Sequence, residues 1–323
     1  MQHSLSRRTF LSTTAVAGMS LLATQGFAAE PSHLPRKKSL IGVPSAELLE
    51  RHKAAGFDGL EATDWSIAPE AAAKLRDTAQ QLGMRIHSVL RGWTDFNSPR
   101  AEQVAKDIAS VETALWASQG YGADAVLLVP CRLLDEVAVP KPEDFAIEYD
   151  EQTGHVTRVV AGDNAAYAPY MQAQNRAIDM SRKALDKLIP VAEKSGVVIA
   201  LENVWSNLWV MPALFAHFVR SFQSRWVQTY FDIGNHVKYA PPEAWIESLG
   251  QTIVKLHVKD FTIDRAAPQG GQFVDIRDGQ VNWPAVVQAL DGVGYRGWLT
   301  IEGSGDLSLE EQSRRLDLIL AGK

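Results

Sequence analysis

Cysteine is almost absent from this sequence. Its 323 residues include a single cysteine, Cys131, which excludes an intramolecular disulfide and any metal site built from several thiolates. The fold must therefore be stabilised by its hydrophobic core, and 46% of the residues are hydrophobic. The length suffices for one large domain, since an eight-stranded β/α barrel typically needs about 250 residues.

Basic charge is also scarce. The sequence has 32 basic and 38 acidic residues, a net charge of −6. Without residues 1–29, which hold Arg7, Arg8 and no acidic residue, the net charge is −8. Such a surface repels phosphate backbones, and no run of charge indicates a basic groove or an amphipathic membrane helix. We therefore expect no nucleic acid partner.

A long apolar run is missing as well, and the N-terminus comes closest to one. Leu11–Ala29 is uncharged but contains Ser, Thr, Gly and Gln, whereas a membrane span needs about 20 strongly apolar residues. The preceding SRRTFL, Ser6–Leu11, is typical of a twin-arginine signal, and Gly26–Ala29 resembles a cleavage region. We predict a Tat signal peptide over residues 1–29, a linker over 30–38 and export of the folded protein to the bacterial periplasm, free of the membrane after cleavage. Retention as a membrane anchor is the alternative.

Short apolar runs alternate with helical patterns over residues 39–323, which is typical of parallel α/β architecture. The predicted strands are Leu40–Val43, Gly59–Ala62, Arg85–Leu90, Ala125–Val129, Val197–Glu202, Val227–Asp232, Ile253–Val258 and Trp298–Ile301. The predicted helices are Ala46–Ala55, Pro69–Leu82, Pro99–Gln119, Tyr170–Ser195, Met211–Phe222, Pro242–Leu249, Trp283–Leu290 and Leu309–Leu320. Because polar residues concentrate at the strand ends, we predict a single-domain (β/α)8 TIM barrel; a doubly wound sheet is the competing fold.

Two stretches depart from this alternation. Residues 131–167 contain FAIEYDEQTGHVTRVV, two alternating runs around Gln152–Gly154, which predicts a β-hairpin inserted after the fourth strand. On the catalytic face it would act as a lid or an oligomer contact, or it would have neither role. Residues 262–282 are Gly-rich and charged and are expected to border the same mouth.

Four side chains stand at the ends of four successive predicted strands: Glu202, Asp232, His257 and Glu302. Taken singly, each has an ordinary explanation as an ion-pair partner, a loop cap or a core histidine. The ends of parallel barrel strands meet at one face, however, so the four groups are expected to converge. Three carboxylates and one imidazole suit a divalent ion, Mn, Co, Mg or Zn, in a site with open positions.

The motifs LENVW, FDIGNH, KLHVKDF, DGQVNWPAVVQAL and GYRGWLTIEG resemble those of the xylose-isomerase-like TIM-barrel superfamily of sugar phosphate isomerases and epimerases. The resemblance covers residues 39–320 and is strongest over Val197–Gly303. It implies that the same four residues hold one divalent metal ion. It also implies that Glu202 and Glu302 act as catalytic acid and base, moving a proton on an open-chain sugar through a cis-enediolate.

The resemblance extends to further positions. It implies that His236, or Asn235 one residue before it, binds substrate, and that Glu61 faces the mouth. Arg277 is expected to bind a sugar oxygen, although its loop departs from the Gly-x-Gly sequence of many members.

Other residues are predicted from their own positions. His87 ends the third strand and is expected either to touch substrate or to be a core histidine. Asp260 is predicted to orient His257. Lys259 is predicted to have a surface or helix-pairing role and not a catalytic one, because alternation points it away from both neighbours. Trp93 stands after a strand end, as do Trp65, Trp205 and Trp209, where aromatic rings stack on sugars.

The predicted function is a divalent-metal-dependent sugar isomerase or epimerase. No Gly-rich phosphate loop is visible and export removes the usual supply of sugar phosphates, so an unphosphorylated carbohydrate is the expected partner; a homo-oligomer is left open. The alternatives are a metal-dependent lyase or hydrolase of a keto-glycoside and a non-catalytic periplasmic sugar-binding barrel. A nuclease would need more metal ligands and a basic groove.

Overall fold

The computed structural model describes residues 35–133, 137–267 and 269–323. The predicted Tat signal and most of the predicted linker lie outside these residues. The described residues belong to one compact unit. No helix within the described ranges has the length and apolar character needed to cross a bilayer.

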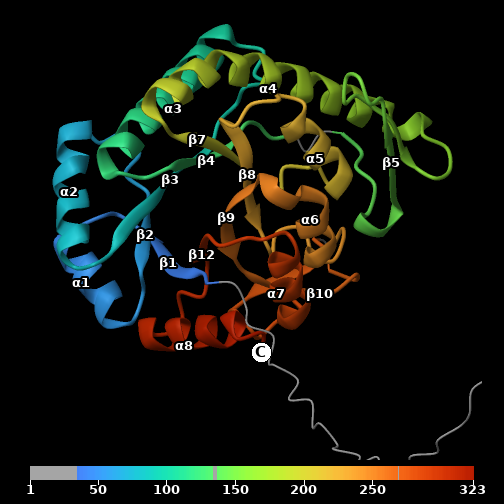
Figure 1. Cartoon of the computed structure of the whole chain (residues 1–323). Coiled ribbons are helices and arrows are strands. Elements are labelled where there is room, and N and C mark those ends of the chain that lie inside the picture. The colour runs from blue at the N-terminus through green and yellow to red at the C-terminus, as the bar shows by residue number, and fades with distance from the viewer. Residues whose placement is uncertain (1–34, 134–136, 268) are drawn as a thin grey trace, which may run out of the picture. The chain divides into compact units, whose positions relative to one another are not determined.

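Eight parallel strands close into a barrel in the order β1-β12-β9-β8-β7-β4-β3-β2, and Figure 1 shows the helices around them. The closure of β1 against both β12 and β2 leaves no free edge, which confirms the predicted TIM barrel and rules out a doubly wound sheet. The barrel strands are β1 (Lys37–Gly42), β2 (Gly59–Ala62), β3 (Arg85–Trp93), β4 (Ala125–Val129), β7 (Val198–Glu202), β8 (Val227–Asp232), β9 (Ile253–Val258) and β12 (Trp298–Ile301).

The first strand begins earlier than the sequence predicted. Lys37 and Lys38 pair with Trp298 and Leu299 of β12, so both belong to the barrel and not to the predicted linker. Only Ser39 and Leu40 of this strand are buried. The start of the strand was missed because its first two residues are charged and lack an apolar pattern.

The helices follow the strands and cover the barrel. They are α1 (Ala46–Ala54), α2 (Pro69–Gln81), α3 (Ala101–Tyr121), α4 (Ala168–Ser195), α5 (Pro212–Arg220), α6 (Pro242–Leu249), α7 (Trp283–Gly292) and α8 (Leu309–Leu320). Local signals fix their starts: the Ser45 and Ser308 hydroxyls accept from backbone amides of α1 and α8, and Pro69 occupies the first turn of α2, where its missing amide hydrogen costs nothing.

Two hairpins are added to the barrel. The predicted one consists of β5 (Phe145–Tyr149) and β6 (Val156–Val160). It packs on the outer helices: Val156 donates its amide to Asn175 of α4, and the Tyr149 ring lies 5.1 Å from that of His217 on α5, as Figure 1 also indicates. The second hairpin, β10 (Asp260–Ile263) and β11 (Gly271–Val274), includes the start of the Gly-rich, charged stretch at residues 262–282.

The barrel interior contains polar side chains as well as apolar ones. His87 on β3 contacts Ser39 on β1 at 2.9 Å and Thr300 on β12 at 3.2 Å through its Nε2 atom. Its ring also stacks on Trp298 with a centroid distance of 4.3 Å. His87 is fully buried in the barrel interior, with hydrogen-bond partners at Nε2 and none at Nδ1. This position agrees with the core-histidine alternative, and the expectation that His87 touches substrate is wrong.

Candidate metal centre

The four side chains predicted to converge lie together at the C-terminal end of the barrel. Glu202 ends β7, Asp232 ends β8, His257 is the penultimate residue of β9, and Glu302 directly follows β12. Each contributes one potential ligand atom, and these atoms all lie within 4.8 Å of one another. The arrangement follows from the fold, because consecutive parallel strands end at one face.

His257 lies at the centre of the cluster. Its Nδ1 atom is 2.8 Å from Glu302 Oε2, 3.2 Å from Glu202 Oε1 and 3.9 Å from Asp232 Oδ2. The side chains of Asp232 and His257 are almost fully buried, whereas that of Glu302 is 31% exposed. Glu302 is therefore the member of the cluster that a ligand entering from solvent meets first.

The position of Asp232 is fixed by the backbone around it. Its Oδ1 atom accepts hydrogen bonds from the amides of Gly234 and Asn235 at 2.8 and 2.7 Å. Asn203 bonds to both the amide and the carbonyl of Asp232 and so ties the ends of β7 and β8 together. The remaining Oδ2 atom is buried and has no hydrogen-bond partner, which is costly unless the atom binds something.

Burial and mutual charge shift the pKa values of the cluster in different directions. Burial raises the pKa of Glu202 and raises that of Asp232 to about 7. For Glu302, burial acts in the same direction, but the charges of His257 and Lys259 outweigh it and hold the pKa well below its usual range. Burial alone would lower the pKa of His257, yet Tyr230 and the surrounding carboxylates raise it well above its usual value.

Glu61 lies behind His257 and does not face the mouth. Its Oε2 atom is 2.6 Å from His257 Nε2, and its Oε1 atom accepts from Ser88 Oγ at 3.0 Å. The carboxylate is fully buried, so the expected contact between Glu61 and substrate is wrong. Glu61 instead has the role that the sequence analysis gave to Asp260, since it orients the imidazole.

Asp260 organises a loop rather than His257. Its Oδ1 atom accepts from the amides of Phe261 and Val281, and its Oδ2 atom accepts from the amide of Arg277 and the indole of Trp283. No oxygen remains for the imidazole, and the prediction that Asp260 orients His257 is wrong. The carboxylate holds the turn between β11 and α7 against the start of β10.

Lys259 is the site residue that the sequence analysis misplaced. Its ammonium lies 3.0 Å from Glu302 Oε2, 3.5 Å from Asp232 Oδ2 and 3.3 Å from Asn235 Oδ1. The expected surface position assumed a continuous strand, but β9 ends at Val258 and β10 begins at Asp260. Lys259 occupies the junction, where side chains no longer alternate, and it turns into the cluster.

The remaining predicted substrate residues lie apart from the cluster. The His236 ring contacts the Val204 carbonyl and packs against Trp245, and burial lowers its pKa to about 3. Its neighbour Asn235, the alternative considered for this position, is the one that reaches Lys259. The His236 ring packs against Tyr239 and Trp245 instead.

Arg277 and Trp93 are both exposed to solvent. Arg277 has a positive φ of 74°, and its backbone amide, not its guanidinium, makes the contact with Asp260. Trp93 is 39% exposed, with the Arg132 guanidinium 4.3 Å above its ring. Neither side chain lines the pocket that adjoins the cluster.

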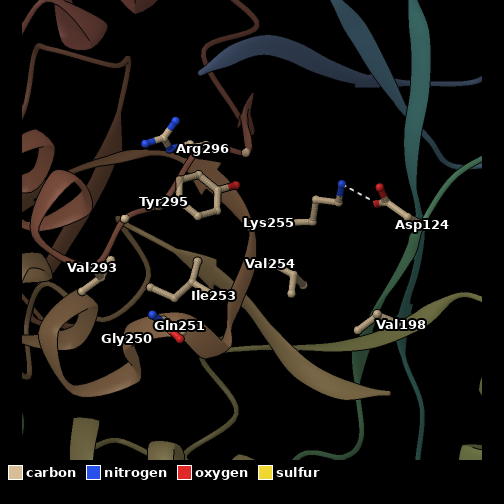
Figure 2. Close-up of a pocket in the computed structure, with 12 residues that line it drawn as sticks. Asp124, Val198, Gly250, Gln251, Ile253, Val254, Lys255, Val293, Tyr295 and Arg296 are labelled. Carbon is tan, nitrogen blue, oxygen red and sulfur yellow. Dashed lines mark ion pairs between the residues drawn. The ribbon is translucent and has the colours of Figure 1, made fainter. Parts of the chain in front are cut away.

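That pocket, called the mouth pocket below, has a volume of about 510 Å³. It is lined by Glu302 and Lys259, by Phe273 of β11, and by the acidic residues Asp275, Asp278 and Asp306. A separate cavity of about 460 Å³ lies at the other end of the barrel, where Figure 2 shows Lys255 facing Asp124. There the two side chains form an ion pair of 2.6 Å at the strand starts, the end of such barrels that serves stability.

Comparison with known proteins identifies the family. The pattern described as "Xylose isomerase-like TIM barrel" matches residues 49–318. The chain belongs to this family. Among curated proteins, the uncharacterized protein MJ1311 of Methanocaldococcus jannaschii is 26% identical over 131 residues, which are 39% of this chain and 43% of that protein. The match thus spans less than half of that relative.

Several solved structures share the barrel of this family member. The 3-keto-D-glucoside 4-epimerase YcjR of E. coli aligns with a TM-score of 0.63 at 14% identity, over 88% of this chain and 98% of that one. D-psicose 3-epimerase of Clostridium cellulolyticum H10 gives 0.64 at 15% identity, over 88% and 98%. D-allulose 3-epimerase of Methylomonas sp. gives 0.59 at 18% identity, over 90% and 95%. At these identities the similarity establishes the fold.

The cluster in this xylose isomerase-like barrel fits a divalent ion. Asp232 presents a buried oxygen without a hydrogen-bond partner, and three carboxylates with one imidazole form the donor set. With Glu61 accepting a hydrogen bond from Nε2, the Nδ1 atom of His257 faces the carboxylates. Loss of the Nδ1 proton would leave the neutral tautomer that a metal ligand requires. Such a set suits Mn, Co, Mg or Zn and leaves positions open.

Proposed function

We propose that the protein is a divalent-metal-dependent sugar isomerase or epimerase that acts on a free sugar or a sugar derivative. The observation that carries the proposal is the convergence of two glutamates, Glu202 and Glu302, with Asp232 and His257 at the mouth of the barrel. A binding protein would not require two carboxylates that flank one reacting carbon. The epimerase names of structurally similar proteins support the same reading.

Glu202, Asp232, Glu302 and Nδ1 of His257 would hold the ion. When bound, such an ion polarises neighbouring carbonyl and hydroxyl oxygens of an open-chain sugar and acidifies the hydrogen on the carbon between them. One glutamate takes this proton and the other returns a proton. Return to the opposite face of the same carbon gives an epimer, and return to the adjacent carbon gives an isomer.

The surrounding residues support this proton transfer. Glu302 is the partly exposed carboxylate and borders the mouth pocket, so it meets the substrate from the solvent side, and Glu202 from the barrel side. The ammonium of Lys259, 3.0 Å from Glu302, adds positive charge where negative charge develops on the sugar oxygens. Glu61 keeps the imidazole of His257 in place throughout.

We also propose Tat export and a periplasmic location, which rest on the SRRTFL segment alone. An exported enzyme of this kind would acquire its metal in the cytoplasm, where it folds. Manganese is the proposed ion within the group that the donors suit. A homo-oligomer stays a prediction.

The first test is the metal content of the purified mature protein, measured by elemental analysis without added metal. Wild type is expected to contain about one divalent ion per chain, and Glu202→Gln and His257→Ala to lose it. His155→Ala is the matched control, because His155 lies between β5 and β6 and pairs with Asp179 of α4. This variant is expected to keep the metal.

Proton exchange then tests the chemistry. The metal-loaded protein in deuterated water is expected to introduce deuterium at carbon into free ketoses, and Glu302→Gln to abolish this exchange. Exchange accompanied by loss of a substituent would favour the keto-glycoside lyase or hydrolase. A wild-type protein that contains no metal, even after reloading, would contradict the proposal and leave a sugar-binding barrel.

A further inference from the structure

One aromatic ring shares the mouth pocket with the candidate metal centre. Phe273 lines this pocket together with Lys259 and Glu302, and the Lys259 ammonium lies between them. Its Nζ atom is 3.0 Å from Glu302 Oε2 and 5.0 Å from the centre of the Phe273 ring. A ligand that places its reacting carbon beside Glu302 therefore has its next group beside Phe273.

The ring of Phe273 is exposed and yet firmly held. It is 41% accessible, while Phe261 packs against it across the β10–β11 hairpin at 5.2 Å and Trp205 at 4.9 Å. Trp205 is fixed in turn by the Lys238 ammonium, 3.5 Å from its ring centre, which also donates to the Gln269 carbonyl in the hairpin turn. The hairpin thus presents a preformed apolar surface to the pocket.

The rim of the mouth pocket is acidic. Asp275, Asp278 and Asp306 line it; Asp278 pairs with Arg315 at 2.8 Å, whereas no cation in the described part of the chain forms an ion pair with Asp275 or Asp306. Carboxylates repel phosphate and carboxylate ligands and accept hydrogen bonds from hydroxyl groups. This rim suits an uncharged, hydroxyl-rich ligand.

We propose that Phe273 forms a second carbohydrate subsite, which binds the ring attached to the reacting sugar, and that the substrate is a neutral glycoside. The apolar face of the attached ring lies on Phe273, and its hydroxyl groups face the acidic rim. This inference rests on the proposed function, because the reacting sugar is placed at Glu302. It assigns the stacking surface to Phe273 instead of Trp93, one of the tryptophans for which the sequence predicted contact with a sugar.

The test compares two ligands that differ by one ring and share a reducing glucose that can open, cellobiose and D-glucose, by calorimetric titration of the metal-loaded protein. Wild type is expected to bind cellobiose about 10-fold more tightly, the factor that corresponds to one stacked ring. Phe273→Ala is expected to remove this preference and to leave the affinity for D-glucose unchanged. Phe273→Leu, which preserves the apolar packing on Trp205, is expected to lose most of the preference as well.

Trp93→Ala and Trp116→Ala are the matched controls. Both remove an exposed aromatic ring outside the mouth pocket, and both are expected to keep the preference for cellobiose. Loss of the preference in Trp93→Ala, with Phe273→Ala unchanged, would place the subsite at Trp93, outside the mouth pocket, and overturn the proposal. An equal loss for both ligands in Phe273→Ala would overturn it too, since the ring would then contact the reacting sugar.

The outcome separates this inference from the proposed function. If wild type binds cellobiose no more tightly than D-glucose while it holds its metal and exchanges protons on free ketoses, the glycoside subsite is wrong and the isomerase stands. If the metal itself is missing, the proposed function fails first. Circular dichroism of each variant shows whether the fold is retained. If Phe273→Ala is unstable, the preference for cellobiose is measured in Phe273→Leu instead.

Discussion

The carboxylate of Glu61 contacts His257 at 2.6 Å from the side of the imidazole that faces away from the candidate metal centre. Glu61 belongs to β2 and His257 to β9, so the contact crosses the interior of the barrel. Glu61 accepts a hydrogen bond from Nε2, so that Nδ1 faces the carboxylates. The geometry of the centre thus depends on a residue that does not belong to it.

Replacing Glu61 tests this dependence. Glu61→Gln keeps a hydrogen-bond acceptor but removes the charge that supports the imidazole, so we expect affinity for the divalent ion to fall about 10- to 100-fold. Competition with a chelator measures the change. Glu151→Gln, an exposed glutamate in the turn of the outer hairpin, is the control, and an unchanged affinity in Glu61→Gln would show that the orienting contact is dispensable.

Lys259 competes with a metal for the same oxygens. Its ammonium lies 3.0 Å from Glu302 and 3.5 Å from Asp232, so Lys259→Met is expected to bind the divalent ion more tightly, by about 10-fold, while proton exchange on sugars becomes slower. Calorimetry and isotope exchange measure the two effects separately. Weaker metal binding in Lys259→Met would mean that the ammonium supports the ion instead of opposing it.

Asp260 is expected to affect stability and not metal binding. In Asp260→Asn, an NH₂ group replaces Oδ2, the oxygen that accepts hydrogen bonds from the Arg277 amide and the Trp283 indole. Both donors then lose their acceptor. Each buried donor without a partner costs about 1–3 kcal/mol in the free energy of unfolding, which urea denaturation measures. The control is Asp264→Asn in an exposed turn. Reduced metal affinity at unchanged stability would restore the original prediction for Asp260.

His52 predicts a pH dependence of stability. Burial, with a smaller contribution from Arg51, lowers its pKa from 6.5 to about 4. Between these values the unfolded chain binds a proton that the folded chain does not, so the free energy of unfolding decreases as the pH falls, by up to about 1.4 kcal/mol per pH unit. Urea denaturation at several pH values is expected to give a smaller slope for His52→Gln than for wild type, and equal slopes would contradict the assignment.

The barrel and the four residues of the candidate metal centre were predictable because the sequence pattern that marks each strand is local. An apolar run marks each strand, and Glu202, Asp232 and Glu302 stand where such runs end, so their common face follows from the parallel topology without knowledge of any contact. His257 lies one residue before its strand end and is covered by the same argument.

The residues that contact these four side chains were not predictable, because their contacts are not local in the sequence. The contact of Glu61 with His257 and the contact of His87 with Thr300 join residues far apart in the sequence, and no pattern in either segment reports them. Lys259 was misplaced because the alternation rule assumes one unbroken strand. The backbone of Gly234 also approaches Lys259 closely, since a Cβ atom at Gly234 would lie 2.6 Å from Lys259 Cβ. This contact is visible in the structure but not in the sequence.

Strand β9 carries two ionisable side chains on its inward face, Lys255 near its start and His257 near its end. A slip of β9 by two residues against its neighbours would keep every side chain on its own face, so the apolar pattern does not forbid it. Such a slip would separate Lys255 from Asp124 and place an ammonium where the imidazole meets Glu61. Only one alignment satisfies both ends, and we therefore expect these charges to fix the pairing register while the barrel closes.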